Sequence, residues 1–283
     1  MKTLRLIGMA LVAVMISAAT TACDDDDDDD DTQNSQTSTS NNGIIVDGKK
    51  LVKTVRYEDD REEYADTYTF SYDSEGRVSN ISNYFQGRLS RSKDFVWGNG
   101  TITETSVDED GTSVSTYTLK NNRVVSEESE DFEATYTYNS DNRIAKASGT
   151  EYSKYGGVYS YSTNYSWDGD KISKGTVTHT DNNEATYSAV ETYHYNGKSC
   201  KGFFPVDLSG ITACHPELFG IRSNLLPDYK TTEVLSGGEN SSKTVYSYTF
   251  DNDGYVISTT MEWIEETEHG TYTWYVHYLY TWE

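Results

Sequence analysis

Glutamates at two places in the chain are close enough in sequence to supply the paired carboxylates of a hydrolase. They are Glu127, Glu128 and Glu130, and Glu262, Glu265, Glu266 and Glu268. Glycoside hydrolysis needs one carboxyl in an apolar pocket that raises its pKa, and a second that stays ionised. Here the glutamates stand among polar residues, as they would on a solvated strand face. We therefore expect a protein that is not an enzyme, and keep a hydrolase as one alternative.

Two acidic turns look like fragments of a calcium-binding loop. They are Asp108-Glu-Asp110-Gly111 and Asp251-Asn-Asp253-Gly254. Both lack the remaining oxygen ligands of a twelve-residue loop, so we interpret them as hairpin turns. The sequence has no nucleophile elbow, phosphate-binding loop or zinc-type spacing of Cys and His, and its five histidines are scattered. It therefore predicts no catalytic residue, no metal and no cofactor.

Aromatic residues are the one compositional excess, with 24 Tyr and 5 Trp. Aromatic faces stack on sugar rings and anchor protein interfaces. Tyrosines can equally fill a wide β core while their hydroxyls stay hydrated. For any single ring the core role is favoured, so the composition alone identifies no ligand-binding residue.

The aromatic residues belong to a repeated unit, for which Tyr68-Thr-Phe-Ser-Tyr-Asp-Ser-Glu-Gly-Arg-Val78 is the clearest copy. Alternating aromatic and small polar residues predict a strand, and Asp followed by Gly predicts a tight hairpin turn. A basic residue and Val or Ile then begin the return strand. The last residues before the predicted turns are 72, 97, 119, 138, 167, 195 and 250. Their spacing is near 25 residues, which is the length of one hairpin. The last interval, from 195 to 250, is about twice as long and suggests that one copy is disguised or replaced.

Consecutive hairpins without helical spacers predict an all-β antiparallel meander of about 14–18 strands. Such a sheet curls, and closure removes its exposed edges. We expect one domain over residues 44–283, folded as a soluble barrel or half-barrel with a partly wet interior. A membrane-spanning porin is the rival, but its lipid-facing band would need more aliphatic residues than these strands supply.

One segment, residues 198–229, interrupts the repeat and is less polar than the rest. We expect it to form an apolar loop with a short helical turn beginning at Pro216, and to act as a plug or cap against the sheet. Cys200 and Cys214 lie within it. In an oxidising compartment they could close a disulfide, and two free buried thiols are the alternative.

The N-terminus directs the chain out of the cytoplasm. Residues 1–22 combine Lys2 and Arg5 with an apolar stretch, which is typical of a signal peptide and too short for a membrane-spanning helix. Cys23 follows small residues, as the diacylated Cys of a bacterial lipobox does, although Thr20 departs from the usual Leu or Val. Ordinary cleavage after Ala22 is the alternative. Residues 23–43 form an acidic and Ser/Thr/Asn-rich tether.

The formal net charge is −23. Nucleic-acid partners require basic patches to neutralise phosphates, so this charge argues against them. Eight consecutive aspartates, Asp24 to Asp31, cannot pack together, so this part of the tether is expected to be solvated.

Two resemblances follow from these motifs. Tyr72-Asp-Ser-Glu-Gly-Arg-Val78 resembles the YD repeat of Rhs-type shell proteins, and the acidic run after Cys23 resembles the surface-export signal of Bacteroidetes lipoproteins. The whole arrangement, including His215-Pro-Glu-Leu-Phe-Gly-Ile-Arg-Ser-Asn-Leu-Leu-Pro227, looks like a Bacteroidetes surface lipoprotein family of unknown function with a porin-like fold. That family supplies no catalytic residues.

These resemblances imply an outer-membrane lipoprotein, palmitoylated at Cys23 and facing the cell exterior. Its first partner would be outer-membrane lipid, held through that anchor. We expect a non-enzymatic binding module for glycan or protein. A carrier of a lipid or other apolar ligand in a half-barrel is the first alternative, and a hydrolase is the second.

Overall fold

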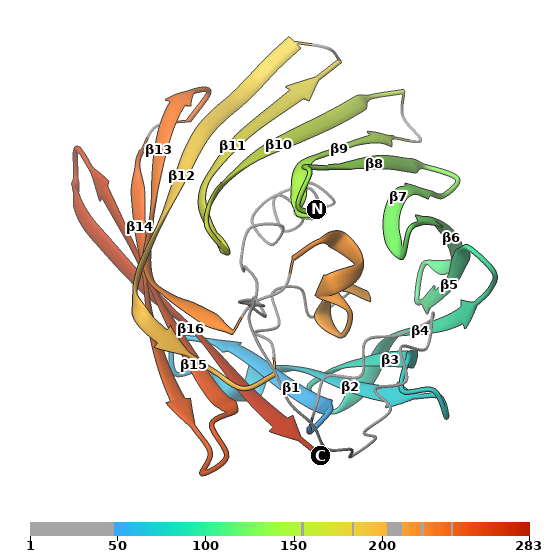
Figure 1. Ribbon diagram of the computed structural model, residues 1–283. Coiled ribbons are helices and arrows are strands. Elements are labelled where there is room, and N and C mark those ends of the chain that lie inside the picture. Colours follow the sequence, from blue (N-terminus) through green and yellow to red (C-terminus); the bar gives the residue numbers. More distant parts are fainter. Residues whose placement is uncertain (1–47, 154–155, 183, 203–210, 222–223, 239) are drawn as a thin grey trace, which may run out of the picture.

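A computed structural model describes residues 48–153, 156–182, 184–202, 211–221, 224–238 and 240–283. The signal peptide, Cys23 and the acidic tether lie outside these residues. Sixteen strands form one closed barrel, in which every strand pairs antiparallel with its neighbours in sequence and β16 pairs with β1 (Figure 1). This arrangement confirms the predicted meander and its closure.

The strands are β1 Leu51–Glu58, β2 Asp66–Tyr72, β3 Val78–Phe85, β4 Arg88–Trp97, β5 Thr101–Asp108, β6 Gly111–Lys120, β7 Arg123–Glu128, β8 Phe132–Tyr138, β9 Ile144–Tyr152, β10 Val158–Asp168, β11 Lys171–Asp181, β12 Glu184–Ser199, β13 Leu225–Ser236, β14 Ser242–Phe250, β15 Val256–Thr267 and β16 Gly270–Trp282. Three short 3-10 helices complete the described chain: η1 Glu62–Tyr64, η2 Ile211–Ala213 and η3 Pro216–Phe219. The first of these lies in the connection between β1 and β2.

The repeated turn forms for the reasons that its sequence suggested. The Asp73 carboxylate accepts hydrogen bonds from the backbone N–H groups of Glu75 and Arg77, at 2.9 and 3.0 Å. Gly76 takes a φ of +81°, which a residue with a side chain adopts only with strain. The same pair of bonds recurs at Asn139 and Asp251. The turn residues therefore set where each return strand begins.

One end of the barrel is sealed by a ring of aliphatic side chains, one from each odd-numbered strand. Its members are Leu51, Val78, Ile102, Val124, Ile144, Ile172, Leu226 and Val256, and each is at most 1% exposed. Each lies at the first or second position of its strand. The Val or Ile that closes six of the seven copies of the repeat is therefore a core residue of this aliphatic ring.

An aromatic residue near the end of each even-numbered strand except β6, which has Leu119 there, ties its hairpin to this ring. Trp97 Nε1 donates to the Val78 carbonyl at 2.8 Å, and Trp167 Nε1 donates to the Ile144 carbonyl at 2.7 Å. Equivalent bonds run from Tyr72, Tyr138, Tyr195, Tyr248 and Trp282 to the starts of their own hairpins. The basic residue of the repeat lies over the ring of the same hairpin, as Arg77 does over Trp97 at 5.5 Å. The order of residue types that repeats along the chain thus corresponds to one hairpin, whose two strands are joined by its own side-chain contacts.

The structure corrects the count of repeats. No copy is missing between Tyr195 and Phe250, because that interval contains one hairpin, as the others do, and its extra length is the insertion between β12 and β13. The copy that the sequence did not reveal is the last one, whose terminal aromatic residue is Trp282. Sixteen strands therefore correspond to eight hairpins.

Residues 211–221 of the insertion lie inside the ring of strands and pack against the aliphatic ring (Figure 1). The ends of the predicted segment belong to the strands, so the insertion is shorter than predicted and starts after Ser199. Pro216 opens η3, as expected, and Gly220 ends it with a φ of +64°. His215 Nε2 accepts a hydrogen bond from the Val78 backbone N–H at 3.0 Å, and its Nδ1 lies 2.9 Å from Glu217 Oε1. These contacts fix the plug, by which we mean the described residues 211–221, to the wall.

Cys200 and Cys214 are both buried, and the disulfide that their spacing allowed is not present in the structure. Each thiol has its own environment. Burial raises the pKa of the Cys200 thiol to about 12, whereas Cys214 Sγ lies 3.5 Å from the Tyr72 hydroxyl. The structure therefore has two buried thiols that are not joined to each other.

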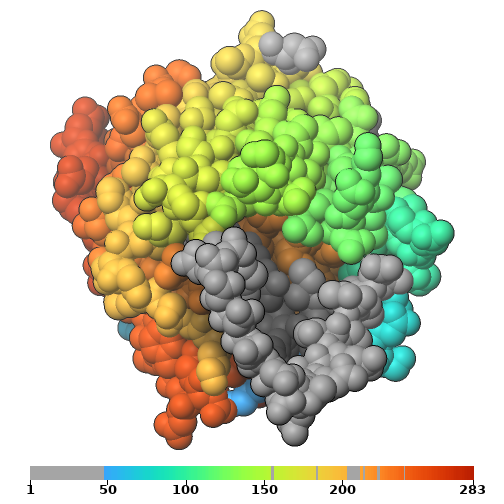
Figure 2. Space-filling view, in the orientation of Figure 1, coloured from blue at the N-terminus to red at the C-terminus, as the bar shows by residue number. Residues whose placement is uncertain are grey.

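The two faces of the wall differ in chemistry. On β10 the inner residues are Tyr159, Tyr161, Thr163, Tyr165 and Trp167, which alternate with Ser160, Ser162, Asn164 and Ser166 on the outer face. The outer positions of β5 are Thr101, Thr103, Thr105 and the exposed Val107. The aromatic faces of the repeat therefore point into the barrel. The wall encloses a hollow in the space-filling view (Figure 2).

Within the described residues, no helix has the length and apolar character needed to cross a membrane.

Candidate binding site on the inner wall

Charged residues are buried on the inner wall, and they are held in pairs. On β12 and β13, Lys230 Nζ lies 2.5 Å from Glu191 Oε1, and both side chains are at most 4% exposed. The Tyr193 hydroxyl donates to Glu191 Oε2 at 2.9 Å. Because ions that leave water must be paired, this triad is a fully buried but satisfied polar group.

The same wall carries a continuous row of inward side chains across five strands. The pairing register places Tyr193 beside Lys230, Lys230 beside Thr244, Thr244 beside Trp263 and Trp263 beside Trp274. The Trp263 and Trp274 rings stack, with centroids 5.3 Å apart and planes 14° apart. We call this set the β12–β16 row. It places two flat rings, which are partly exposed, beside a buried hydroxyl and a buried, paired ammonium group on one face of the sheet.

A second triad lies on the opposite part of the ring of strands, on β4, β5 and β6. Lys93 Nζ lies 2.7 Å from Glu104 Oε1, and the Tyr117 hydroxyl donates to Glu104 Oε2 at 3.0 Å. Glu127 on β7 is the direct partner of Tyr117 and accepts a hydrogen bond from the Tyr136 hydroxyl at 3.1 Å. Burial, and then the negative charge of Glu104, raise the pKa of the Glu127 carboxyl to about 7.

The glutamate clusters that the sequence singled out are divided by the pleat of the sheet. Glu127 is directed inward, whereas Glu128 and Glu130 are exposed. In the second cluster, Glu262 accepts a hydrogen bond from the outward Tyr275, and Glu265 accepts one from Asn240. Neither cluster forms a carboxylate pair within itself. The pair that does form joins Glu127 to Glu104, and sequence spacing gave no sign of it because the two residues lie on different strands.

The acidic turns behave as turns. Asp251 accepts backbone hydrogen bonds within its loop and also pairs with Lys49 at 2.8 Å. Asp108 pairs with Arg91 at 2.8 Å. Among the residues that the structure describes, no three His, Cys, Asp or Glu side chains are grouped so as to hold a metal ion.

Some aromatic residues face outward, and the repeat pattern alone does not distinguish them from the aromatic residues of the core. Tyr57 stacks on His277 with centroids 4.8 Å apart, and His194 stacks on Tyr229 at 4.2 Å. Tyr275 is 40% exposed. Each lies between inward residues of its own strand, so the period-two pattern of the strands was the signal that could have identified them.

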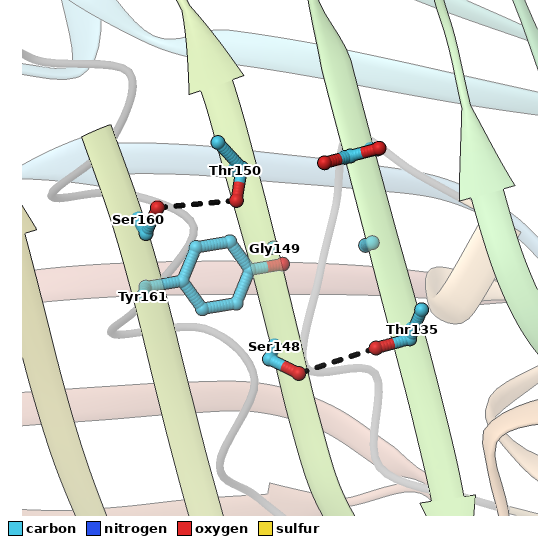
Figure 3. A pocket seen from close by; sticks show the side chains of 8 residues that line it. Thr135, Ser148, Gly149, Thr150, Ser160 and Tyr161 are labelled. Atoms are coloured by element: carbon cyan, nitrogen blue, oxygen red, sulfur yellow. Dashed lines mark hydrogen bonds between the residues drawn. The ribbon is translucent and has the colours of Figure 1, made fainter. Parts of the chain in front are cut away.

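A hollow with a volume of about 170 Å³ lies over β8, β9 and β10 and is lined mainly by outward residues of these strands. Hydroxyl groups that line it are already bonded across strands: Thr135 to Ser148, and Thr150 to Ser160 (Figure 3). The Tyr161 ring lies across Gly149, its direct cross-strand partner (Figure 3). The hollow is thus a consequence of packing around a glycine, and it presents no group suited to chemistry.

Substituting Gly149 by Ala should destabilise the barrel. A Cβ atom at this position would lie 2.6 Å from Tyr161 Cε1, which is closer than non-bonded carbon atoms approach. We expect a loss of about 1–3 kcal/mol in the free energy of unfolding, as for other overpacked sites. Denaturant titration measures the change. In a Tyr161→Leu background the same Gly149→Ala substitution should be nearly neutral, and an equal loss in both backgrounds would contradict this explanation.

Comparisons with known proteins agree with the architecture. No protein-family model matches the sequence, and no curated protein matches it. Among solved structures, a porin-like protein from Bacteroides uniformis is similar with a TM-score of 0.59 and 18% identity, over 82% of this chain and 98% of that one. A porin-like protein from Bacteroides vulgatus has a TM-score of 0.58 and 12% identity, over 83% and 99%. The chain shares its fold with these porin-like proteins. At such identities the likeness concerns the fold alone.

Proposed function

We propose that the protein is a lipid-anchored barrel on the outer surface of the outer membrane, where it acts as a non-enzymatic binding module for a glycan or a protein. The observation that carries this proposal is the division of chemistry between the two faces of the wall. On β5 and β10 hydroxyl and amide residues predominate on the outer face, whereas most rings and the buried paired charges lie on the inner face. Recognition chemistry thus lies within the barrel.

The outer face favours water over lipid as its surroundings. A barrel that spans a membrane presents an apolar band about 25 Å tall to the hydrocarbon. On β5 and β10 the corresponding positions are mostly Thr, Ser and Asn, and Val107 and Val158 are the apolar exceptions. A lipid anchor at Cys23 supplies the attachment that such a barrel needs. Added to planar lipid bilayers, the protein should produce no conductance steps, and reproducible steps would contradict this part of the proposal.

The inner face argues against the alternative of an apolar carrier. Buried threonines on the wall, such as Thr232 and Thr244, have hydroxyl groups without partners, and an apolar ligand would leave them unsatisfied. The interior beside the plug is filled by the aliphatic ring. A glycan or a polar protein segment therefore suits the remaining surface better than a lipid does.

Anchoring and surface display can be tested together in cells that carry the gene. The wild-type protein should incorporate labelled palmitate and be digested by protease added to intact cells, because the acidic tether would carry it outward. Cys23→Ser should lose the label. Protection from protease until the outer membrane is permeabilised would place the protein in the periplasm and contradict surface display.

Glu104 and Glu127 favour hydrolysis as a second candidate function. Both approach the Tyr117 hydroxyl. Glu104 is paired with Lys93, and the carboxyl of Glu127 has a pKa of about 7. A carboxyl that keeps its proton beside one that is ionised is the arrangement of an acid and a base. If this pair is catalytic, Glu127→Gln and Glu104→Gln will each abolish release of reducing ends from soluble polysaccharides. A wild-type protein that releases none removes this candidate.

A further inference from the structure

Polar atoms without hydrogen-bond partners gather on the β12–β16 wall. In the described part of the chain these include Thr232 Oγ1, Thr244 Oγ1, Tyr246 Oη and Trp263 Nε1, on three consecutive strands. Thr232, Thr244 and Tyr246 are 8%, 1% and 2% exposed. Leaving a buried polar group unsatisfied costs about 1–3 kcal/mol, so such a concentration needs an explanation.

These atoms surround the β12–β16 row. Thr244 is a member of the row, Thr232 pairs with Glu191, and Tyr246 follows Thr244 on the same face of β14. From Tyr193 to Trp274 the row crosses four strand spacings, roughly 19 Å at about 4.8 Å each. It therefore has the length of an extended chain of several units.

The far end of the row presents flat apolar surface. Trp263 and Trp274 stack on one another, and both remain partly exposed, unlike Tyr193 and Lys230 deeper in the wall. Surfaces that combine aromatic faces with a few placed hydroxyl and charged groups recognise ligands that have both apolar and polar faces. A sugar ring has one face of C–H groups and a rim of hydroxyls.

We propose that the β12–β16 row is a binding site for a linear oligosaccharide, with a sugar ring stacked on the Trp263–Trp274 pair and hydroxyls bonded to Thr244, Tyr246 and the Lys230–Glu191 pair. The inference rests on the proposed function and names its ligand class and its site. An anionic ligand suits the row less well, because Lys230 is already neutralised by Glu191 at 2.5 Å. A lipid chain would leave the hydroxyls unsatisfied.

The test uses the purified full-length protein and a panel of cellohexaose, xylohexaose, mannohexaose and maltohexaose, with quenching of tryptophan fluorescence as the readout. At least one hexasaccharide should bind. Trp274→Ala should weaken that binding by tenfold or more, since a buried Trp contact is typically worth more than 1.4 kcal/mol at an interface. Tyr275→Ala is the matched control, because its ring lies on the outer face of the same strand.

Thr244→Val separates binding from folding. Val has the shape of Thr without the hydroxyl, and this hydroxyl has no partner among the described residues. The substitution should leave the thermal midpoint unchanged or raise it, while weakening the saccharide about tenfold. Binding that survives both Trp274→Ala and Thr244→Val, or that is lost in Tyr275→Ala, overturns the site. Failure of all four saccharides overturns the ligand class, whereas failure of surface display is scored separately by protease digestion of cells.

Discussion

Ile172→Ala should lower the free energy of unfolding by about 2–5 kcal/mol, as large-to-small substitutions in fully packed cores do. Ile172 is 0% exposed and belongs to the aliphatic ring, where its carbonyl also accepts the Tyr195 hydroxyl bond. A cavity at this position would remove contacts from both neighbouring hairpins and from the interior of the sealed end. Chemical denaturation followed by near-ultraviolet circular dichroism measures the loss.

Ile257→Ala is the matched control for this prediction. Ile257 is the same residue type in a strand of the same barrel, but it is 39% exposed. Its truncation should change the free energy of unfolding by less than about 0.5 kcal/mol, as surface substitutions usually do. Similar losses for the two variants would mean that the ring does not hold the sealed end together.

The second large effect concerns pH. Burial and the neighbouring Glu104 raise the pKa of Glu127 from an ordinary 4.5 to about 7, so the folded protein binds this proton more tightly than the unfolded chain does. Stability from this group is therefore complete below pH 4.5 and is lost as pH rises through 7. At about 1.4 kcal/mol per pKa unit, the loss is on the order of 3 kcal/mol.

Glu127→Gln should abolish most of this slope and make the protein more stable than wild type at pH 8. Glu128→Gln is the control, because its side chain is exposed on the neighbouring position. Charges that face Glu127 are those of Glu104 and Lys93, with the hydroxyls of Tyr117, Tyr136 and Tyr161 around it. Denaturant midpoints measured from pH 4 to pH 8 provide the comparison, and parallel curves for wild type and Glu127→Gln would refute the assignment.

The barrel could be predicted because each hairpin encodes its own contacts. Asp73, Gly76 and Arg77 determine one turn, and Val78 and Trp97 join the two strands of the hairpin that follows it. These are short-range relationships, so a repeated pattern reveals them. The number of hairpins was less certain, since the last copy ends the described chain at Trp282 without a following turn.

Most of the candidate site could not be predicted, because it depends on which strands become neighbours. The row from Tyr193 to Trp274 draws on residues 81 positions apart, and its members have no common spacing. The Glu104–Glu127 pair likewise depends on the register between β5, β6 and β7. The alternation of aromatic and polar residues predicts which side chains share a face of one strand. Only the closed sheet shows that the aromatic face is the inner one.

Closure of the barrel also brings the two ends of the described chain to the same end of the barrel. Lys50 and Glu283 exchange backbone hydrogen bonds, so both terminal strands finish beside the plugged end, next to Leu51. A tether that precedes Gly48 therefore leaves from the closed base. If that tether is anchored in lipid, the closed base faces the membrane. The open mouth then points into the medium, and within the row Trp263 and Trp274 lie nearest to this mouth. A ligand would then reach the row without passing between the protein and the lipid.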